Sequence, residues 1–491
     1  MLVVGLLCLV IFLSFHDSMS DYFVCDDFSH IVNNNQAMSW KGLIGMFTSL
    51  HVFGRWYRPL FELSIRLDWL LFGLNPEGYH FTSLVLYVLT TFLVYLIAGR
   101  LLGNKLFAAL SSVFFAVYGY HSEVVVWIGA RADLLGTLFF LLAFFSYVLH
   151  EYQKRSQVAF TIGMLSFVLS LLCKESMVSL PLVLAGYELL ILRHRWLTAL
   201  KRTSPFWGIL ILYLPLRLVA GGGYRNLPTV LRFVAQVGYY LFSPFVVIPG
   251  DYLASRALEA WKMQPFLPLL TAFLSVMPLL LLLLIVGKVP VWREKTVLFG
   301  LLWLVATSLP VMTVAAERMT FLPSVGYAIA VGSATRLVWI RGKKIWKGNW
   351  GRFVMIGCVI SLLLAHIITQ QWRNFWWSES AKVVRQIIDD VQNLYPMPPS
   401  GSTFVFVNMP DNIHLAMNMR NVMPYALWLF YDDRSIKAYT SYDQDRLLLT
   451  TAEIQDFVEE ITGDEKAFVL VYREGHLVDV TDEVYGTGDK E

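Results

Sequence analysis

The sequence predicts a polytopic α-helical membrane protein, from its composition, the grouping of its apolar residues and its basic connectors. Hydrophobic residues make up 56% and charged residues 15% of the chain, whereas about a quarter of a soluble protein is charged. The apolar residues form blocks such as Val85–Ile97, Val158–Leu172 and Leu267–Val286, which approach the roughly 20 residues that cross a bilayer as a helix. Since lipid satisfies no backbone polar group, these blocks are expected to be helices.

About eleven segments are candidate membrane spans. They are residues 1–16, 79–99, 104–119, 133–150, 157–173, 176–192, 204–219, 265–286, 296–313, 319–338 and 352–369. The first has no basic residue before its apolar run and no small-residue cleavage site, so we interpret it as an uncleaved span and not as a signal peptide.

Basic residues in the connectors predict the orientation of these spans. They occur at 100–105, 154–155, 193–202, 288–295 and 341–352, and the positive-inside bias places such loops in the cytoplasm. All of them lie on that side if residues 220–264 stay outside as a re-entrant or interfacial segment. The N-terminus is then inside and the C-terminus outside. The outward loops are residues 17–78, 119–132, 173–175, 220–264 and 314–318, followed by the tail.

The first outward loop and the tail contain further predicted elements. In loop 17–78, residues 40–50 and 56–72 mix aromatics, leucines and charges, as interfacial helices do; packing against the bundle is the alternative. The tail predicts helices at 378–394, 413–430 and 451–461 and strands at 403–408, 435–439 and 467–472, with a break at 396–401. This order indicates a small extracytoplasmic α/β domain over 370–491, after a transmembrane domain over 1–369.

Ionisable residues at the outward ends of spans are the candidates for function, because charges near membrane depth are costly. Asp26 and Asp27 follow the first span. Two adjacent carboxylates in a partly buried site do not both ionise cheaply, so one is expected to act as a base while the other orients a substrate or a metal ion. The alternative is an ordinary loop start or helix cap.

Four further charged groups lie in outward loops. They are His121 and Glu123 with Arg131 and Asp133, then Lys174 with Glu175, then Glu317 with Arg318, and Arg58 among aromatic residues. Arginine binds phosphate through a planar fork of donors and lysine binds it as a point charge. The alternatives are internal ion pairs that cap helices, a charged hairpin turn and, for Arg58, an interfacial aromatic belt.

This arrangement suits the chemistry of a lipid-linked phosphosugar. Arg131, Lys174 and Arg318 would hold the donor phosphate, and Asp26 or Asp27 would deprotonate or orient the acceptor hydroxyl. Arg58, His121, Glu123, Asp133, Glu175 and Glu317 are supporting residues. The sequence contains no ligand cluster that decides metal use, so no cofactor is assigned and a divalent metal stays open.

The same segments, taken in order, resemble the transmembrane O-mannosyltransferases of the TMTC type, within the GT-C superfamily. The matching pieces are DDFSHIVNN (26–34), YRPLFELSIRLDWLLFGLNPEGYH (57–80), HSEVVVWIGARADLLG (121–136), CKESM (173–177) and AERMTFLPSVGY (315–327). The resemblance implies a GT-C fold, a polyprenyl- or dolichyl-phosphate sugar donor and an acidic pair near the reaction centre, here Asp26 and Asp27. Two features depart from that family: Tyr118 replaces a second histidine, and the tail has no tetratricopeptide repeats.

The sequence therefore predicts an inverting GT-C glycosyltransferase that moves a sugar, such as mannose or another hexose, from a polyprenyl-phosphate donor to an extracytoplasmic protein, glycan or lipid. A transporter or flippase of lipid-linked saccharides and a catalytically silent membrane scaffold are the alternatives. The formal net charge of +3 suggests no nucleic-acid partner. The four cysteines form no disulfide framework, and the absence of an Asn-x-Ser/Thr acceptor favours a bacterial inner membrane over the endoplasmic reticulum.

Overall fold

The structure is a computed structural model of the 491-residue chain. It describes residues 2–35, 40–48, 57–153, 155–219, 237–240, 243, 266, 269–276, 291–312, 316–345, 350–414, 416–419, 421–443, 447–463 and 465–486. Most of the segment 220–264, which we predicted to stay outside the membrane, lies beyond the described residues.

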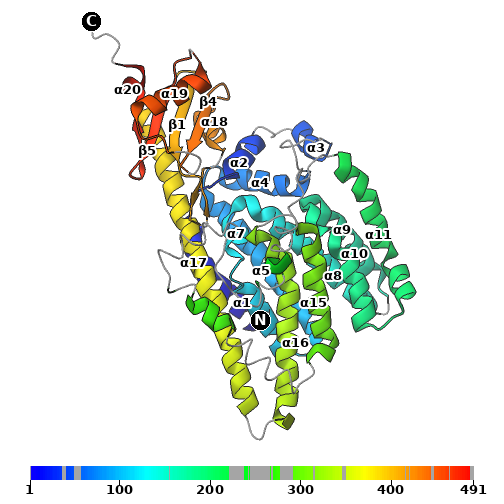
Figure 1. Ribbon diagram of the computed structural model, residues 1–491. Helices are drawn as coiled ribbons and strands as arrows, with labels where there is room; N and C mark the ends of the chain where they lie inside the picture. Colours follow the sequence, from blue (N-terminus) through cyan, green and yellow to red (C-terminus); the bar gives the residue numbers. More distant parts are fainter. Residues whose placement is uncertain are drawn as a thin grey trace.

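The larger part of the molecule is a helical bundle (Figure 1). Its helices are α1 (Leu2–Phe15), α5 (Pro76–Leu102), α6 (Lys105–Ala116), α8 (Arg131–Tyr152), α9 (Gln157–Cys173), α10 (Leu180–Gly186), α11 (Trp196–Val219), α15 (Lys295–Ser308), α16 (Phe321–Ile345) and α17 (Trp350–Leu394). Helix covers most of each predicted span that is described. Among the described residues, four helical stretches are long and apolar enough, by length and composition, to cross a membrane: Pro76–Leu102, Ile128–Tyr152, Glu317–Arg341 and Gly351–Leu394.

Local signals in the sequence explain where these helices turn and pack. Gly103 ends α5 in the left-handed conformation, with φ of 62°, and the Asn104 side chain caps α6 by accepting a 3.0 Å hydrogen bond from Leu106 N–H. Helices α15 and α16 cross closely at Gly300 and Gly326, where an added Cβ would lie 2.5 Å or less from backbone oxygen of the other helix. Small residues allow this approach of two helix backbones.

Short helices cover one end of the bundle (Figure 1). They are α2 (Asp27–Asn35), α3 (Trp40–Thr48) and α4 (Pro59–Phe72). Four short turns between helices of the bundle lie near them: α7 (Ser122–Val126), η2 (Ile128–Ala130), η3 (Glu175–Ser179) and η7 (Glu317–Thr320). Helix α4 buries Phe61 and Ile65 against its neighbours and leaves Leu67 and Leu71 exposed. Packing against the bundle, the alternative to the interfacial interpretation, therefore describes one face of α4, and the interfacial position of the exposed face stays a prediction. We call this end of the bundle, which the sequence predicts to face outward, the outer end.

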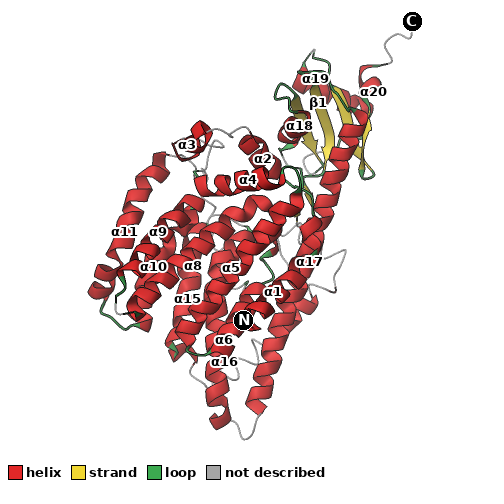
Figure 2. Ribbon diagram, turned by 180° about the vertical axis from the view of Figure 1, so that it is seen from behind, coloured by secondary structure: helices red, strands yellow, loops and turns green. Residues whose placement is uncertain are grey.

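Helix α17 continues from the bundle into a small α/β unit, which contains a four-stranded sheet (Figure 2). The strand order is β4 (Lys437–Tyr442), β1 (Thr403–Met409), β5 (Phe468–Arg473) and β6 (His476–Asp479), with the first three parallel and β6 antiparallel to β5. The other elements are β2 (Asn412–Ile413), β3 (Ala416–Met417), α18 (Met423–Tyr431), α19 (Thr451–Thr462) and α20 (Thr481–Tyr485).

Strand β1 is the centre of this sheet because both of its faces are apolar. Phe404 and Phe406 join the core that includes α17 and α18, whereas Val405 and Val407 pack with Ile454 and other residues of α19 and α20. A continuous apolar run is typical of a strand covered by helices on both sides.

The predicted helix 413–430 is wrong over its first half, because β2, β3 and a loop precede α18 there. The predicted helix 378–394 is not a separate element but the end of α17. The expected division at 369/370 consequently falls inside a continuous helix.

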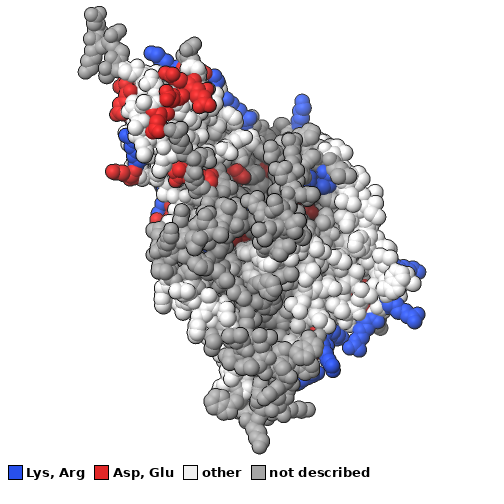
Figure 3. All heavy atoms as spheres, in the orientation of Figure 1, with Lys and Arg blue, Asp and Glu red and all other residues white. Residues whose placement is uncertain are grey.

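The α/β unit is docked on the outer end of the bundle. The backbone N–H of Cys25 donates to the Asn418 carbonyl at 2.9 Å, and Arg434 Nη2 donates to the Val32 carbonyl at 3.1 Å. Basic side chains gather along the end of the bundle opposite the sheet, and others lie among the acidic side chains of the α/β unit (Figure 3). Arg155, Arg193 and Arg195 are exposed in the connectors of that end.

Candidate active site

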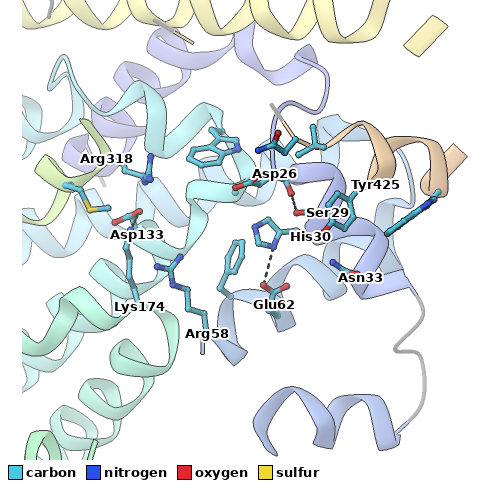
Figure 4. A pocket seen from close by; sticks show the side chains of 17 residues that line it. Asp26, Ser29, His30, Asn33, Arg58, Glu62, Asp133, Lys174, Arg318 and Tyr425 are labelled. Atoms are coloured by element: carbon cyan, nitrogen blue, oxygen red, sulfur yellow. Dashed lines mark hydrogen bonds and ion pairs between the residues drawn. The ribbon is translucent and has the colours of Figure 1, made fainter. Parts of the chain in front are cut away.

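A cavity of about 810 Å³ lies at the outer end of the bundle. It is lined by α2, α4, the loops around residues 127–133, 174 and 318, and the start of α18. Figure 4 shows that Arg58, Asp133, Lys174 and Arg318 gather on one side of it, and that Asp26, Ser29, His30 and Asn33 gather on the other. We call these the cation end and the acid end.

The two carboxylates of the acidic pair have different surroundings. Asp26 is exposed and lines the cavity, while Asp27 is 1% exposed and faces away from it. Asp27 accepts hydrogen bonds from the backbone N–H groups of Gly129, at 2.8 Å, and Val24, at 3.0 Å. Burial raises the pKa of Asp27 to about 7, although these two bonds lower it. Asp27 therefore joins two loops, and Asp26 is the carboxylate that a bound molecule meets.

Helix α2 carries the rest of the acid end on one face. Ser29, His30 and Asn33 follow Asp26 at helical spacing and all line the cavity. His30 Nδ1 lies 3.2 Å from Glu62 Oε1 of α4. Burial lowers the pKa of His30, but the charge and hydrogen bond of Glu62 raise it above its ordinary value. Sequence reasoning missed His30 and Glu62, although the spacing of Asp26 and His30 was the signal that pointed to one helix face.

Two ion pairs form the base of the cation end. Arg58 Nε and Nη2 donate to the two oxygens of Glu175 at 3.0 and 2.7 Å, and Lys174 Nζ donates to Asp133 Oδ2. Burial raises the pKa of Glu175, but the charge and hydrogen bonds of Arg58 outweigh it and bring the pKa to about 2. The adjacent residues Lys174 and Glu175 thus pair across loops, and not with each other as a simple hairpin turn would have them.

Arg318 supplies the third cation. Its guanidinium and its backbone N–H both donate to Glu123, the latter at 2.8 Å, and the guanidinium lies 5.1 Å from the centre of the Trp127 ring. The cation end therefore contains three basic side chains held in place by three carboxylates. Buried charges that are paired in this way keep a defined geometry, which a bound anion can use.

Arg131 lies outside the cavity. It is 0% exposed, and its guanidinium donates to Asp68 Oδ2 at 2.5 Å, to Ser83 Oγ at 3.1 Å and to the Tyr79 carbonyl at 2.7 Å. These partners come from α4 and α5, so Arg131 ties three helices together at the start of α8. The expectation that Arg131 holds a donor phosphate disagrees with this placement, because the side chain is fully buried away from the cavity among three internal partners.

Two other predicted supporting residues also lie outside the cavity. His121 is fully buried between the Tyr87 hydroxyl, 2.7 Å from its Nδ1, and Ser324 Oγ, 2.9 Å from its Nε2. Glu317 pairs with Arg373 of α17. Both residues hold the helices under the site and do not face a ligand.

Within the described parts of the chain, no group of three or more His, Cys, Asp and Glu side chains is placed to hold a metal ion. The use of a divalent metal ion therefore stays open, and the side chains of the cavity alone carry the proposed chemistry.

The chain is similar to known proteins in part of its sequence and in its fold. Residues 58–219 match the family model described as dolichyl-phosphate-mannose-protein mannosyltransferase. The Archaeoglobus fulgidus oligosaccharyltransferase, solved as a complex with Zn and sulfate, matches 96% of this chain and 67% of its own with a TM-score of 0.51 and 10% sequence identity, a likeness of fold alone. This likeness agrees with the GT-C fold that the sequence predicted.

Within that class, the chain resembles the TMTC-type protein O-mannosyl-transferases, as the sequence predicted. It is 37% identical to Tmtc1 of Drosophila melanogaster over 133 residues, which are 27% of this chain and 15% of the relative. It is 25% identical to TMTC3 of Mus musculus over 430 residues, 76% of this chain and 46% of the relative. The chain thus spans less than half of the length of these relatives.

Proposed function

We propose that this protein transfers a sugar from a polyprenyl- or dolichyl-phosphate donor to a hydroxyl group of an acceptor, with mannose or another hexose as the sugar. The observation that carries the proposal is the two-ended cavity, which has basic residues at one end and an accessible carboxylate at the other. The family match and the similarity to protein O-mannosyl-transferases support the same reaction class.

The cation end is assigned to the donor phosphate. A sugar phosphodiester carries one negative charge, and the departing lipid phosphate gains a second when the bond from the sugar breaks. Lys174 has three N–H donors, of which its contact with Asp133 uses one. Lys174, Arg318 and Arg58 would therefore stabilise charge that develops in the transition state, which is the interaction that accelerates a reaction.

The acid end is assigned to the base. Asp26 would take the proton of the acceptor hydroxyl while the hydroxyl oxygen forms a bond to the anomeric carbon. The bond between that carbon and the phosphate oxygen breaks at the same time, and its electron pair leaves with the lipid phosphate. A single displacement of this kind inverts the anomeric configuration. General-base assistance typically contributes 10²–10⁴-fold.

The proposed topology places this site outside the cytoplasm. About eleven spans with the N-terminus inside leave the basic connectors in the cytoplasm and the cavity on the opposite side. A transmembrane domain and an extracytoplasmic α/β unit, joined through the continuous helix α17, complete the arrangement. A bacterial inner membrane is favoured over the endoplasmic reticulum, and the acceptor is a protein, a glycan or a lipid.

The experiment is transfer from radiolabelled polyprenyl-phosphate hexoses to membrane acceptors by the purified chain and by Asp26→Asn. The variant is expected to lose at least 100-fold in transfer rate while it still binds the donor. Full transfer by Asp26→Asn would falsify the assignment of the base. Donor that crosses the membrane without modification of any acceptor would favour a flippase, and donor that is bound without either event would favour a scaffold.

A further inference from the structure

The acid end of the cavity is completed by a helix of the α/β unit. Helix α18 contributes Tyr425 and Trp428 to the cavity wall, and Asn421 lies just before this helix. In Figure 4, Tyr425 stands beside Ser29 and His30, on the side away from Lys174 and Arg318. We propose that Tyr425 and Trp428 form an aromatic shelf that holds a hexose ring next to Asp26, which makes the α/β unit the sugar-binding wall of the active site. This inference rests on the proposed function.

The shelf is a rigid feature of the α/β unit. Tyr425 and Trp428 are three residues apart on one face of α18, and their rings meet edge to face with centroids 5.2 Å apart. Trp428 Nε1 donates to the Ile436 carbonyl at 2.7 Å, which fixes the indole at the start of β4. Both residues line the cavity, and the polar atom of the indole is already satisfied within the α/β unit.

The shelf is also held against the acidic pair. The Asn418 carbonyl accepts from the Cys25 backbone N–H, and the Asn418 side chain donates to the carbonyl and the hydroxyl of Ser380 on α17. Cys25 has a φ of 49°, a left-handed conformation that a non-glycine residue adopts only when its surroundings hold it. Because Asp26 follows Cys25 directly, the α/β unit sets both the shelf and the direction of the carboxylate.

Polar groups without partners surround the shelf. Three polar groups of the described residues form no hydrogen bond: the Tyr425 hydroxyl, the side-chain amide of Asn33 and the Nδ2 of Asn421. The other side-chain atom of Asn421, Oδ1, accepts from the Tyr442 hydroxyl at 3.2 Å. Each of these groups lines the cavity or belongs to a residue that does. By contrast, every cation of the opposite end is paired with a carboxylate.

These features match the chemistry of a sugar ring. A hexose has apolar C–H faces, which pack on aromatic rings, and hydroxyls around its rim, which are donors and acceptors for amides, phenols and carboxylates. The cavity of about 810 Å³ has the size of ligand pockets that enclose most of a small molecule, so a hexose at this end leaves room for a phosphate at the other.

The ring can come from two sources, the hexose of the donor or a sugar of a glycan acceptor, and the experiment separates them. The full-length protein is purified in lipid nanodiscs as wild type, Tyr425→Ala, Trp428→Ala and Tyr425→Phe. Tyr439→Ala is the matched control, because Tyr439 is an exposed tyrosine of the same unit that does not line the cavity. Binding of polyprenyl phosphate, binding of polyprenyl-phosphate hexose and transfer to glycan and peptide acceptors are measured.

We expect all variants to bind polyprenyl phosphate within about twofold of wild type, since the cation end is unchanged. A loss of tenfold or more in affinity for polyprenyl-phosphate hexose in both alanine variants identifies the donor sugar as the occupant. Unchanged donor binding with a tenfold higher KM for a glycan acceptor identifies the acceptor sugar. Tyr425→Phe, which keeps the ring, is expected to lose less than Tyr425→Ala in either case.

The shelf assignment is overturned if both alanine variants match Tyr439→Ala in all of these measurements, or if only the KM for a peptide acceptor changes. Asp26→Asn is run alongside and keeps the two proposals distinguishable. If Asp26→Asn loses transfer while the shelf variants do not, the reaction class stands and the shelf fails. If Asp26→Asn transfers normally, the proposed function fails. Should an alanine variant not fold, Tyr425→Leu and Trp428→Leu, which remove the aromatic ring but keep a large apolar side chain, carry the same comparison.

Discussion

Removing the carboxylates of Asp26 and Asp27 one at a time is expected to damage the protein in two different ways. In Asp27→Ala, the backbone N–H of Val24 loses its acceptor in a buried place, and the N–H of Gly129 loses it at the cavity wall, where water can replace it. An unsatisfied buried donor costs about 1–3 kcal/mol, so the variant is expected to lose about that much stability through Val24. In Asp26→Ala, an exposed side chain disappears, and the stability is expected to change by no more than about 0.5 kcal/mol.

The stability of Asp27→Ala should also depend on pH in a defined direction. A carboxyl whose pKa is about 7 in the folded chain and ordinarily 3.8 binds its proton more tightly when folded. Its contribution to stability is therefore complete below about pH 4 and is lost as the pH rises to about 7, by up to about 4 kcal/mol. The difference in stability between wild type and Asp27→Ala should therefore be larger at pH 5 than at pH 8.

The assay is thermal unfolding in detergent, followed by tryptophan fluorescence from pH 5 to 8, with donor transfer measured on the same preparations. Asp26→Ala should melt with wild type and lose transfer, and Asp27→Ala should melt earlier, most clearly at the acidic end. The reasoning is refuted if Asp27→Ala melts with wild type at pH 5, or if the gap widens as the pH increases.

Three further predictions test other parts of the structure. Arg131→Met leaves Asp68 buried without its partner and should destabilise the protein by about 3–5 kcal/mol; an unchanged melting temperature with weaker donor binding would instead return Arg131 to the ligand site. Lys174→Met should weaken polyprenyl phosphate binding by about tenfold or more, the worth of a charged hydrogen bond, and equal affinity in a filter-binding assay would contradict the cation end. Gly326→Ala brings a Cβ within 2.4 Å of the Gly300 carbonyl and should destabilise the protein by about 1–3 kcal/mol; a melting curve like that of wild type would show that the two helices can separate without penalty.

The sequence predicted the bundle well because long apolar runs have few alternatives in lipid. It also placed strand 403–408 correctly. The apolar run at these positions corresponds to β1, in which all seven residues are buried. It misread the segment before α18, where Ile413, Ala416 and Met417 have the apolar spacing of a helix but form β2 and β3 with Asn412. Short pairings of this kind depend on contacts with α17, which local pattern does not contain.

For the site, the sequence identified the charged residues but not which of them face one another. Arg131 and Lys174 are both basic residues in outward loops, yet one is enclosed by α4 and α5 and the other lines the cavity. The difference arises from Asp68, which the sequence analysis treated only as part of an interfacial helix. Tyr425 and Trp428 could not be predicted at all, because they reach the cavity only through the docking of a separate unit.

The length of α17 has a consequence for how the two halves of the active site are kept in register. The helix has 45 residues and rises about 1.5 Å per residue, so it measures roughly 68 Å, more than twice the hydrocarbon core of a bilayer. The α/β unit packs on the C-terminal part of this helix. Its distance from the bundle and its rotation about the helix axis therefore depend on the number of residues in the helix. One inserted residue in the protruding part would turn the unit by about 100°. Point substitutions along its exposed faces are thus far better tolerated than any change in its length.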